Sequence, residues 1–130
     1  MADGRFAVLI VEDDVLIRFA LADAFNDRSW DVTEASSALE AIAALGGGHQ
    51  FDVLVTDVDM PGPLNGLHLA TMAARLFPRM SVAVSSGRHE IEAQLSAEVS
   101  FFPKPASPDE IALYFRDRLS MANDPQQLAS

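Results

Sequence analysis

Short apolar runs alternate along the chain with longer amphipathic segments, and this alternation limits the possible folds more than any other feature. Residues 6–11 (FAVLIV) and 51–56 (FDVLVT) are strand-length runs rich in apolar and β-branched residues. Runs of this kind suit strands that are covered on both faces, as in a parallel sheet. Residues 30–34 are a short and weak strand candidate, and residues 81–85 and 99–102 are two further strands. The chain therefore offers five strands, separated by segments that can form crossover helices.

The segments between these strands repeat apolar residues every three or four positions, which predicts amphipathic helices. A capping-box pattern from Ser37 to Glu40 opens the second helix, and the glycines at 46–48 close it. Between residues 87 and 98 the apolar face is little more than Ile91 and Leu95, so we expect this fourth helix to be short. The last helix opens with Ser107 as cap, Pro108 in the first position and Glu110 as the capping-box acid. The expected inward-facing residues are Ile17, Leu21, Ala24 and Phe25 within 16–27, Leu69, Met72, Ala73 and Leu76 within 65–77, and Ile111, Phe115 and Leu119 in the last helix.

Five strands that alternate with five helices predict a doubly wound α/β fold. Since crossovers between parallel strands are right-handed and cover both faces, a five-stranded parallel sheet is the favoured topology. A chain of 130 residues has the length of one domain and can bury a core without disulfides or metal. We expect this domain to span residues 5–121, followed by a polar and disordered tail at 122–130.

The composition excludes several classes of function. Without cysteine, the chain has neither a disulfide framework nor a thiolate metal site. Its formal net charge of −10 argues against a nucleic-acid surface, which requires clustered basic residues. No secretory signal is visible, and no apolar stretch reaches the roughly 20 residues of a membrane span. We therefore expect a cytoplasmic protein that binds neither nucleic acid nor membrane directly.

Polar residues follow four of the five predicted strands at the point where each strand ends. In open parallel sheets, ligands bind beyond the carboxyl ends of the strands, so these residues are expected to meet at one edge. They are Glu12, Asp13 and Asp14 after the first strand, Asp57 and Asp59 after the third, Ser85 and Ser86 at the fourth, and Lys104 after the fifth.

This set of side chains favours one kind of chemistry. Carboxylates brought together raise one another's pKa unless a cation neutralises them. Oxygen ligands without neighbouring histidine or cysteine favour a hard cation such as Mg²⁺, which binds through one or two carboxylates and phosphate oxygens. A lysine opposite the acids suits phosphate oxygens as well. The natural interpretation is an aspartate that accepts a phosphoryl group and forms an acyl phosphate.

Four motifs, VEDDVLIR, VTDVDMPG, VSSG and FFPKP, occur in this order and resemble the receiver domain of bacterial two-component response regulators. The resemblance covers about residues 5–121 and extends to standalone single-domain regulators. It implies the flavodoxin-like strand order 2-1-3-4-5. It also implies a phosphorelay switch rather than a metabolic enzyme, one that catalyses only its own phosphorylation and dephosphorylation. The implied partners are a histidine kinase or phosphotransfer protein and a downstream protein target, for a monomer or a phosphorylation-dependent dimer.

The resemblance also assigns roles to individual residues. Asp57 would be the phosphoacceptor, and Glu12 and Asp13 the acidic pair for Mg²⁺, with Asp13 favoured as the direct ligand. The backbone carbonyl of Asp59 would contribute to the metal site. Lys104 would bind the phosphate. The remaining implied roles are the switch hydroxyl at Ser85, the switch aromatic at Phe101 and a cis peptide bond before Pro105.

Three departures from the family pattern stand out. The turn at residues 60–66 (MPGPLNG) is one residue longer than the usual Met-Pro-x-x-Asp-Gly, with Asn65 in place of the aspartate. The interval from Ser85 to Lys104 is short, which agrees with a reduced fourth helix. Ala106 stands where an aromatic residue commonly follows Lys-Pro. The partner face around the fourth and fifth helices is therefore expected to be atypical.

Two other functions remain open from the sequence. Asp57 and Asp59 also resemble the nucleophile motif of the haloacid dehalogenase superfamily, which would make the protein a Mg²⁺-dependent phosphatase. That motif normally opens its domain, whereas here two strands and two helices precede it, and Pro61 replaces an expected Thr or Val. A third possibility is a receiver-like binding module that works without phosphorylation. Asp14 is interpreted as a helix cap, and His49, His68 and His89 as surface residues without metal-ligand spacing.

Overall fold

A computed structural model describes residues 5–122, and its sheet has five parallel strands. The strand order is β2-β1-β3-β4-β5, so the predicted flavodoxin-like topology is confirmed. Every observed strand lies within about a residue or two of its predicted position. The strands are β1 (Ala7–Val11), β2 (Asp31–Ala35), β3 (Val53–Asp57), β4 (Ser81–Ser86) and β5 (Val99–Pro103).

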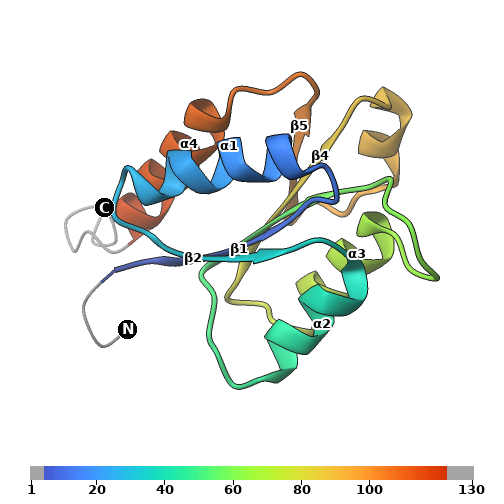
Figure 1. Ribbon diagram of the computed structural model, residues 1–130, viewed down its shortest axis with the longest axis horizontal. Helices are drawn as coiled ribbons and strands as arrows, with labels where there is room; N and C mark the ends of the chain where they lie inside the picture. Colours follow the sequence, from blue (N-terminus) through green and yellow to red (C-terminus); the bar gives the residue numbers. More distant parts are fainter. Residues whose placement is uncertain (1–4, 123–130) are drawn as a thin grey trace.

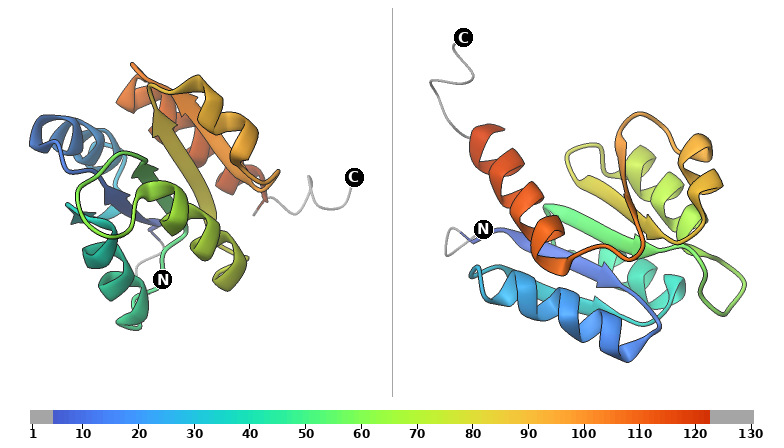
Figure 2. Two further views of the ribbon diagram at one scale, coloured as in Figure 1. Left: turned by 90° about the vertical axis from the view of Figure 1, so that its right-hand side faces the viewer. Right: turned by 90° about the horizontal axis from the view of Figure 1, so that it is seen from above.

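Helices cover both faces of this sheet, as Figure 1 shows with α1 and α4 above it and α2 and α3 below it. Seen from above in Figure 2, α1 and α4 lie at an angle across the same face. The α-helices are α1 (Val15–Asn26), α2 (Ala38–Gly46), α3 (Gly66–Leu76) and α4 (Pro108–Ala122). The expected short fourth helix is a single 3-10 helix, η1 (His89–Gln94), which Ile91 ties to the α2–α3 side.

Alternating side chains of the strands form two separate cores. In β1, Leu9 and Val11 belong to the core on the α2–α3 side, whereas Val8 and Ile10 belong to the core on the α1–α4 side. All five residues of β1 are buried, because this strand is central and is covered on both faces. Burial on both faces is therefore the reason for its continuous apolar run, as predicted from the sequence.

Helix ends follow the capping residues, with one difference in detail. Asp14 caps α1 by accepting hydrogen bonds from the backbone N–H groups of Leu16 and Ile17, as interpreted from the sequence. Ser37 caps α2 by accepting from the Glu40 N–H. The Glu40 carboxylate, however, accepts from the Ser36 N–H at 2.8 Å, so the reciprocal bond reaches one residue beyond the predicted cap.

Two residues predicted to face inward lie at the surface instead. Leu76 at the end of α3 is 65% exposed, and Ile17 in α1 is 38% exposed. Leu76 is the last residue of α3, and Ile17, in the first turn of α1, borders a cavity between α1 and the segment that leads into α4. The remaining inward predictions are buried or half-buried.

The described residues contain no helix long and apolar enough to cross a membrane. The predicted domain boundary at residue 121 falls within α4, and most of the predicted tail, residues 123–130, lies outside the described residues. The predicted end of the domain at residue 121 and the predicted disorder of the tail therefore stay predictions.

Candidate phosphoacceptor site

Three carboxylates meet at the carboxyl edge of the sheet, where the end of β1 lies beside the end of β3. Glu12 and Asp13 follow β1, and Asp57 is the last residue of β3. One oxygen from each of these three carboxylates lies within 4.8 Å of the others. Glu12 and Asp57 are nearly buried, with side chains 3% and 10% exposed, whereas Asp13 faces solvent. The arrangement is an oxygen-only cluster of the type that suits a hard cation.

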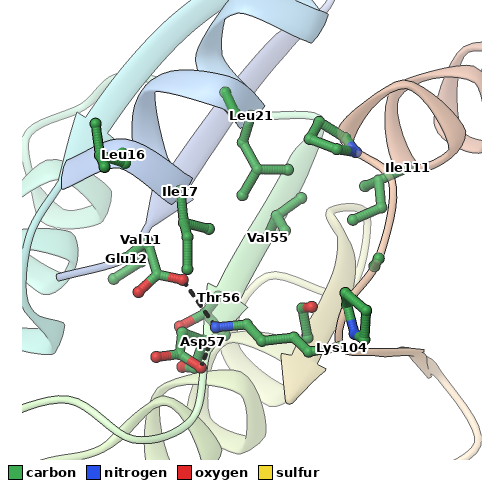
Figure 3. A pocket seen from close by; sticks show the side chains of 15 residues that line it. Val11, Glu12, Leu16, Ile17, Leu21, Val55, Thr56, Asp57, Lys104 and Ile111 are labelled. Carbon is green, nitrogen blue, oxygen red and sulfur yellow. Dashed lines mark hydrogen bonds and ion pairs between the residues drawn. The ribbon is translucent and has the colours of Figure 1, made fainter. Parts of the chain in front are cut away.

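Lys104 brings a positive charge into this cluster from the segment after β5. Its ammonium Nζ donates to Glu12 Oε1 at 3.0 Å and to Asp57 Oδ1 at 3.1 Å, as Figure 3 shows by the two dashed lines. These contacts join residues 92 and 47 positions apart in the chain. The sequence prediction that acids and a lysine meet at one edge is therefore borne out in geometry.

Burial and charge shift the pKa values of two groups here. Burial raises the pKa of Glu12 above its usual value, outweighing the hydrogen bonds from the Asp14 N–H and from Lys104. For Lys104, burial alone would lower the pKa, but the hydrogen bonds to Glu12 and Asp57 and the charges of both acids together raise it. The lysine is therefore held firmly in its charged form by the two acids it bridges.

The other predicted site residues lie around this cluster. Ser85 on β4 is the register partner of Asp57 on β3, and both residues line a cavity whose wall also includes Glu12 and Lys104. Phe101 on β5 is half-buried against the core on the α2–α3 side. The peptide bond between Lys104 and Pro105 is cis, as expected from the sequence.

Asp59 does not join the cluster with its side chain. Its carboxylate is largely exposed and forms two hydrogen bonds with the Arg88 guanidinium, at 3.0 and 3.2 Å. This ion pair links the loop after β3 to the loop after β4. The sequence analysis missed Arg88, although a basic residue just beyond the end of a strand facing acids was a usable signal.

Arg18 is a second residue that the sequence analysis left without a role. Its guanidinium donates to the Glu12 carbonyl oxygen at 2.9 Å and pairs with Glu34 at 3.1 Å. Arg18 thereby ties α1 to the backbone at the end of β1 and to β2. It lies within the quoted motif VEDDVLIR, but a linear pattern does not reveal a side chain that reaches back along its own helix.

Gly66 allows α3 to begin directly against the end of β3. A Cβ atom at this position would overlap the carbonyl oxygen of Asp57, so no larger residue fits without moving the helix. The Gly66 N–H donates to the Val58 carbonyl at 2.9 Å, and Asn65 caps α3 in a capping box with His68. The longer turn 60–66 therefore still delivers a tightly seated helix beside Asp57.

The model of the response regulator receiver domain family matches residues 8–116 of this chain. The chain belongs to this receiver domain family. Its receiver sequence is 32% identical over 123 residues to the sensor kinase CckA of Brucella abortus, and 30% identical over 117 residues to the aerobic respiration control protein ArcA of Escherichia coli K12. The matches cover 89% and 87% of this chain, but it spans only 13% of CckA and 48% of ArcA.

Among solved structures, the receiver is similar to the BeF3-activated receiver domain of nitrogen regulatory protein C. The TM-score is 0.75 at 28% identity, and the match covers 92% of this chain and 98% of that one. Receiver domains are regulatory phosphoacceptor domains of two-component systems that act with histidine kinases and downstream effectors. The family binds Mg²⁺ at an acidic pocket, and the acidic cluster of this chain is Glu12, Asp13 and Asp57.

Proposed function

We propose that this receiver accepts a phosphoryl group on Asp57 from the phosphohistidine of a kinase or phosphotransfer protein. The Asp57 carboxylate oxygen attacks phosphorus, the new O–P bond forms, and the N–P bond to the imidazole breaks, so the imidazole nitrogen leaves with the electron pair. The contact of Lys104 with both Asp57 and Glu12 is the observation that carries the proposal. It places a fixed positive charge beside the carboxylate that would carry the phosphoryl group.

The residues that would hold Mg²⁺ are Glu12, Asp13 and Asp57, with the backbone carbonyl of Asp59 as a further ligand. Their carboxylate oxygens lie close enough to share one ion, and a set of oxygen ligands fits this hard cation. When bound, Mg²⁺ supplies positive charge that offsets the repulsion between these acids and the phosphoryl oxygens. Asp13 is the favoured direct ligand because its carboxylate faces solvent and can bind without breaking an existing ion pair.

Phosphorylation would then change the surface through residues of the neighbouring strands. A phosphoryl group on Asp57 adds negative charge next to Lys104, so the ammonium would bind the phosphoryl oxygens in place of the free carboxylate. Ser85, the register partner of Asp57, would donate its hydroxyl to the same group. Phe101, half-buried on β5, would shift with it and bias a two-state equilibrium of the surface recognised by a downstream protein.

The haloacid dehalogenase alternative is disfavoured by the position of Asp59. A phosphatase of that type needs this second acid directed at the phosphoryl group, whereas here its carboxylate binds Arg88 and is exposed. The proposed switch is accordingly a regulator, with residues 5–121 as its folded unit. We place it in the cytoplasm, where sensor kinases present their phosphohistidine.

The test is phosphorylation by acetyl phosphate in the presence of Mg²⁺, followed by intact-mass measurement. We expect one added phosphoryl group on the wild-type chain and none on Asp57→Asn. An exposed acid on α1 provides the matched control, since Asp23→Asn should label like the wild type. Efficient hydrolysis of phosphate monoesters that depends on Asp59 would replace the switch by a phosphatase, and complete absence of labelling would leave a phosphorylation-independent module.

A further inference from the structure

The guanidinium of Arg18, near the start of α1, reaches back to the acidic residues that follow β1. Its Nη1 donates to the Glu12 carbonyl oxygen at 2.9 Å, and its Nε donates to Glu34 Oε1 on β2 at 3.1 Å. The side chain is only 16% exposed, and its Cζ lies 5.8 Å from the centre of the Phe19 ring, within the range of a cation–π contact. Hydrogen bonds from a charged donor are stronger than those between neutral groups. Arg18 therefore joins the backbone after β1 firmly to β2.

With the bond from Arg18, every polar atom of Glu12 has a partner. The Glu12 N–H donates to the Ala35 carbonyl at 3.0 Å. One carboxylate oxygen, Oε2, accepts from the Asp14 N–H at 3.1 Å, and the other, Oε1, accepts from the Lys104 ammonium. Arg18 supplies the partner of the remaining atom, the carbonyl oxygen. The peptide group that joins Glu12 to Asp13 therefore has a fixed direction.

Asp13 depends on this peptide group for its own position. Its side chain is exposed, so little packing holds it in place, yet its carboxylate is one of the three that lie within 4.8 Å of one another in the acidic cluster. Because a peptide group is planar, a rotation at the Glu12 carbonyl also moves the Asp13 N–H and Cα. Mg²⁺ requires near-ideal octahedral geometry. A small rotation of this peptide group would therefore change how well the cluster fits the ion.

We propose that Arg18 is a positioning residue of the Mg²⁺ site, which acts by holding the Glu12 carbonyl and thereby the direction of Asp13. The inference rests on the proposed function and adds to its metal site a residue from outside the carboxylate cluster. In this role Arg18 touches neither the ion nor the phosphoryl group. Partners that orient metal-binding groups from behind contribute strongly to metal affinity.

The sign of the effect on Mg²⁺ binding separates positioning from charge. A guanidinium close to a cation site repels the cation, so its removal would strengthen Mg²⁺ binding if charge alone were at work. Loss of positioning weakens the binding instead, because Asp13 is no longer held in the geometry that the ion requires. Weaker Mg²⁺ binding after the removal of a nearby positive charge would therefore have a geometric cause.

Arg28, at the other end of α1, offers a matched control. Its Nη1 donates to the Ala24 carbonyl at 2.7 Å and to Asp109 Oδ1 at 3.0 Å, and its side chain is 21% exposed. Arg18 and Arg28 thus each bind one backbone carbonyl and one carboxylate from the same helix. Replacement of either by alanine removes one positive charge and the same kinds of bond, but only Arg18 contacts the backbone of the acidic cluster.

The experiment measures Mg²⁺ affinity by amide NMR on the full-length chain, with MgCl2 titrated at constant ionic strength. The variants are Arg18→Ala, Arg18→Met and Arg28→Ala. Methionine keeps an unbranched apolar stem, so Arg18→Met preserves the packing of α1 where alanine would loosen it. Dispersed amide signals show that each variant is folded, and the shifts of residues 12–14 give the dissociation constant of the ion.

Both Arg18 variants should raise the dissociation constant for Mg²⁺ about tenfold or more, whereas Arg28→Ala should keep the wild-type value. Labelling by acetyl phosphate should separate in the same way. The Mg²⁺ concentration that gives half the maximal labelling rate should rise with the dissociation constant, while the rate at saturating Mg²⁺ stays close to that of the wild type. A general loss of structure would lower the saturated rate instead.

Mg²⁺ binding by the Arg18 variants that equals or exceeds that of the wild type would overturn the inference. An equal loss of affinity in Arg28→Ala would overturn it as well, since the effect would then come from loosening α1. Either result leaves the proposed function standing, provided that the wild type binds Mg²⁺ and is labelled on Asp57. If the wild-type signals of residues 12–14 do not respond to Mg²⁺ and acetyl phosphate labels nothing, the proposed function fails and the inference falls with it.

Discussion

Among single residues, Lys104 is the one that forms ion pairs with two acids of the site, Glu12 and Asp57. Its ammonium contacts two nearly buried carboxylates, those of Glu12 and Asp57, which repel each other. Burial and the neighbouring charge of Asp57 both raise the pKa of Glu12. A positive charge between two acids weakens their repulsion and lowers the pKa of a neighbouring carboxyl, although burial keeps the pKa of Glu12 raised. The same ammonium is the group that would bind a phosphoryl group on Asp57, so its structural and functional roles cannot be separated by position alone.

Replacement of Lys104 by alanine should therefore lower the stability of the metal-free protein and increase its response to Mg²⁺. Without the ammonium, Glu12 and Asp57 keep buried charge with one partner fewer, which costs about 1–3 kcal/mol. The ion then replaces the lost positive charge, so Mg²⁺ should raise the melting temperature more in Lys104→Ala than in the wild type. Thermal unfolding with EDTA and with Mg²⁺ measures both quantities.

Arg116→Ala is the matched control, because Arg116 pairs, among the residues that the structure describes, only with exposed Asp117 at 3.4 Å. Pairs of this kind contribute little to stability, and neither the melting temperature nor the Mg²⁺ response should change. A Lys104→Ala protein as stable as the wild type without metal would contradict the role of this lysine.

The acids and the lysine could be predicted from the sequence because each follows a strand, and parallel strands bring their carboxyl ends to one edge. Arg88 and Arg18 could not be predicted in the same way. Both are long side chains whose partners, Asp59 and the Glu12 carbonyl, depend on loop paths and rotamers rather than on periodicity. A sequence pattern predicts at which end of a strand or helix a residue lies. It does not predict which partner a long side chain reaches.

At the scale of elements, the position of α3 against β3 depends on one glycine. Gly66→Ala should destabilise the protein by about 3 kcal/mol, the upper end of the usual cost of overpacking, because its Cβ would overlap the Asp57 carbonyl. Gly46→Ala is the matched control, since no atom lies within 4 Å of a Cβ there and alanine favours the helix. Chemical denaturation measures both. Equal stabilities for the two variants would show that α3 shifts freely.

The ion pair between Asp59 and Arg88 joins the loop that follows β3 to the loop that follows β4, two residues beyond Asp57. Arg88→Ala should free both loops and admit water, so we expect the phosphorylated form to lose its phosphate several-fold faster. Pulse labelling with acetyl phosphate, followed by decay of the phosphoprotein mass, measures the rate. Asp59→Asn should act in the same direction, and the double variant should add little to either one.

The control for this experiment is Arg118→Ala. Its guanidinium donates to the Tyr114 hydroxyl on α4, far from the loops, and its loss should leave the decay rate unchanged. A slower decay in Arg88→Ala would contradict a shielding role and would mean that the guanidinium itself assists hydrolysis.

Element boundaries show the same division between what a pattern fixes and what tertiary contacts decide. The periods of α1 and α3 are correct in sequence, yet Ile17 and Leu76 lie at the surface. Ile17 borders a largely apolar cavity between α1 and the segment that leads into α4, so its exposure depends on the path of that segment. Helix amphipathicity predicts which face turns inward, but whether a neighbour covers each position is decided by the whole fold.

For the whole molecule, the net charge is a contribution to stability that solution conditions can change. A formal net charge of −10 on 130 residues produces self-repulsion that salt screens, while a cation bound only by the folded state stabilises it by mass action. The two effects are separable because screening depends on ionic strength alone, whereas binding saturates at the affinity of the site. The acidic cluster and the overall charge should therefore give distinct responses to Na⁺ and Mg²⁺.

We expect NaCl to raise the melting temperature gradually, and MgCl2 at the same ionic strength to raise it by several degrees more. At a free Mg²⁺ concentration of 100 times the dissociation constant, binding adds about 2.7 kcal/mol, which suffices for such a shift in a domain of this size. Asp13→Asn removes the solvent-facing ligand of the cluster and should abolish the Mg²⁺ increment while keeping the NaCl response. Asp23→Asn, exposed on α1, changes the net charge equally and should keep both. If Asp13→Asn keeps an Mg²⁺ increment equal to that of Asp23→Asn, Asp13 is no ligand of the ion, and the cluster of Glu12, Asp13 and Asp57 is not the metal site.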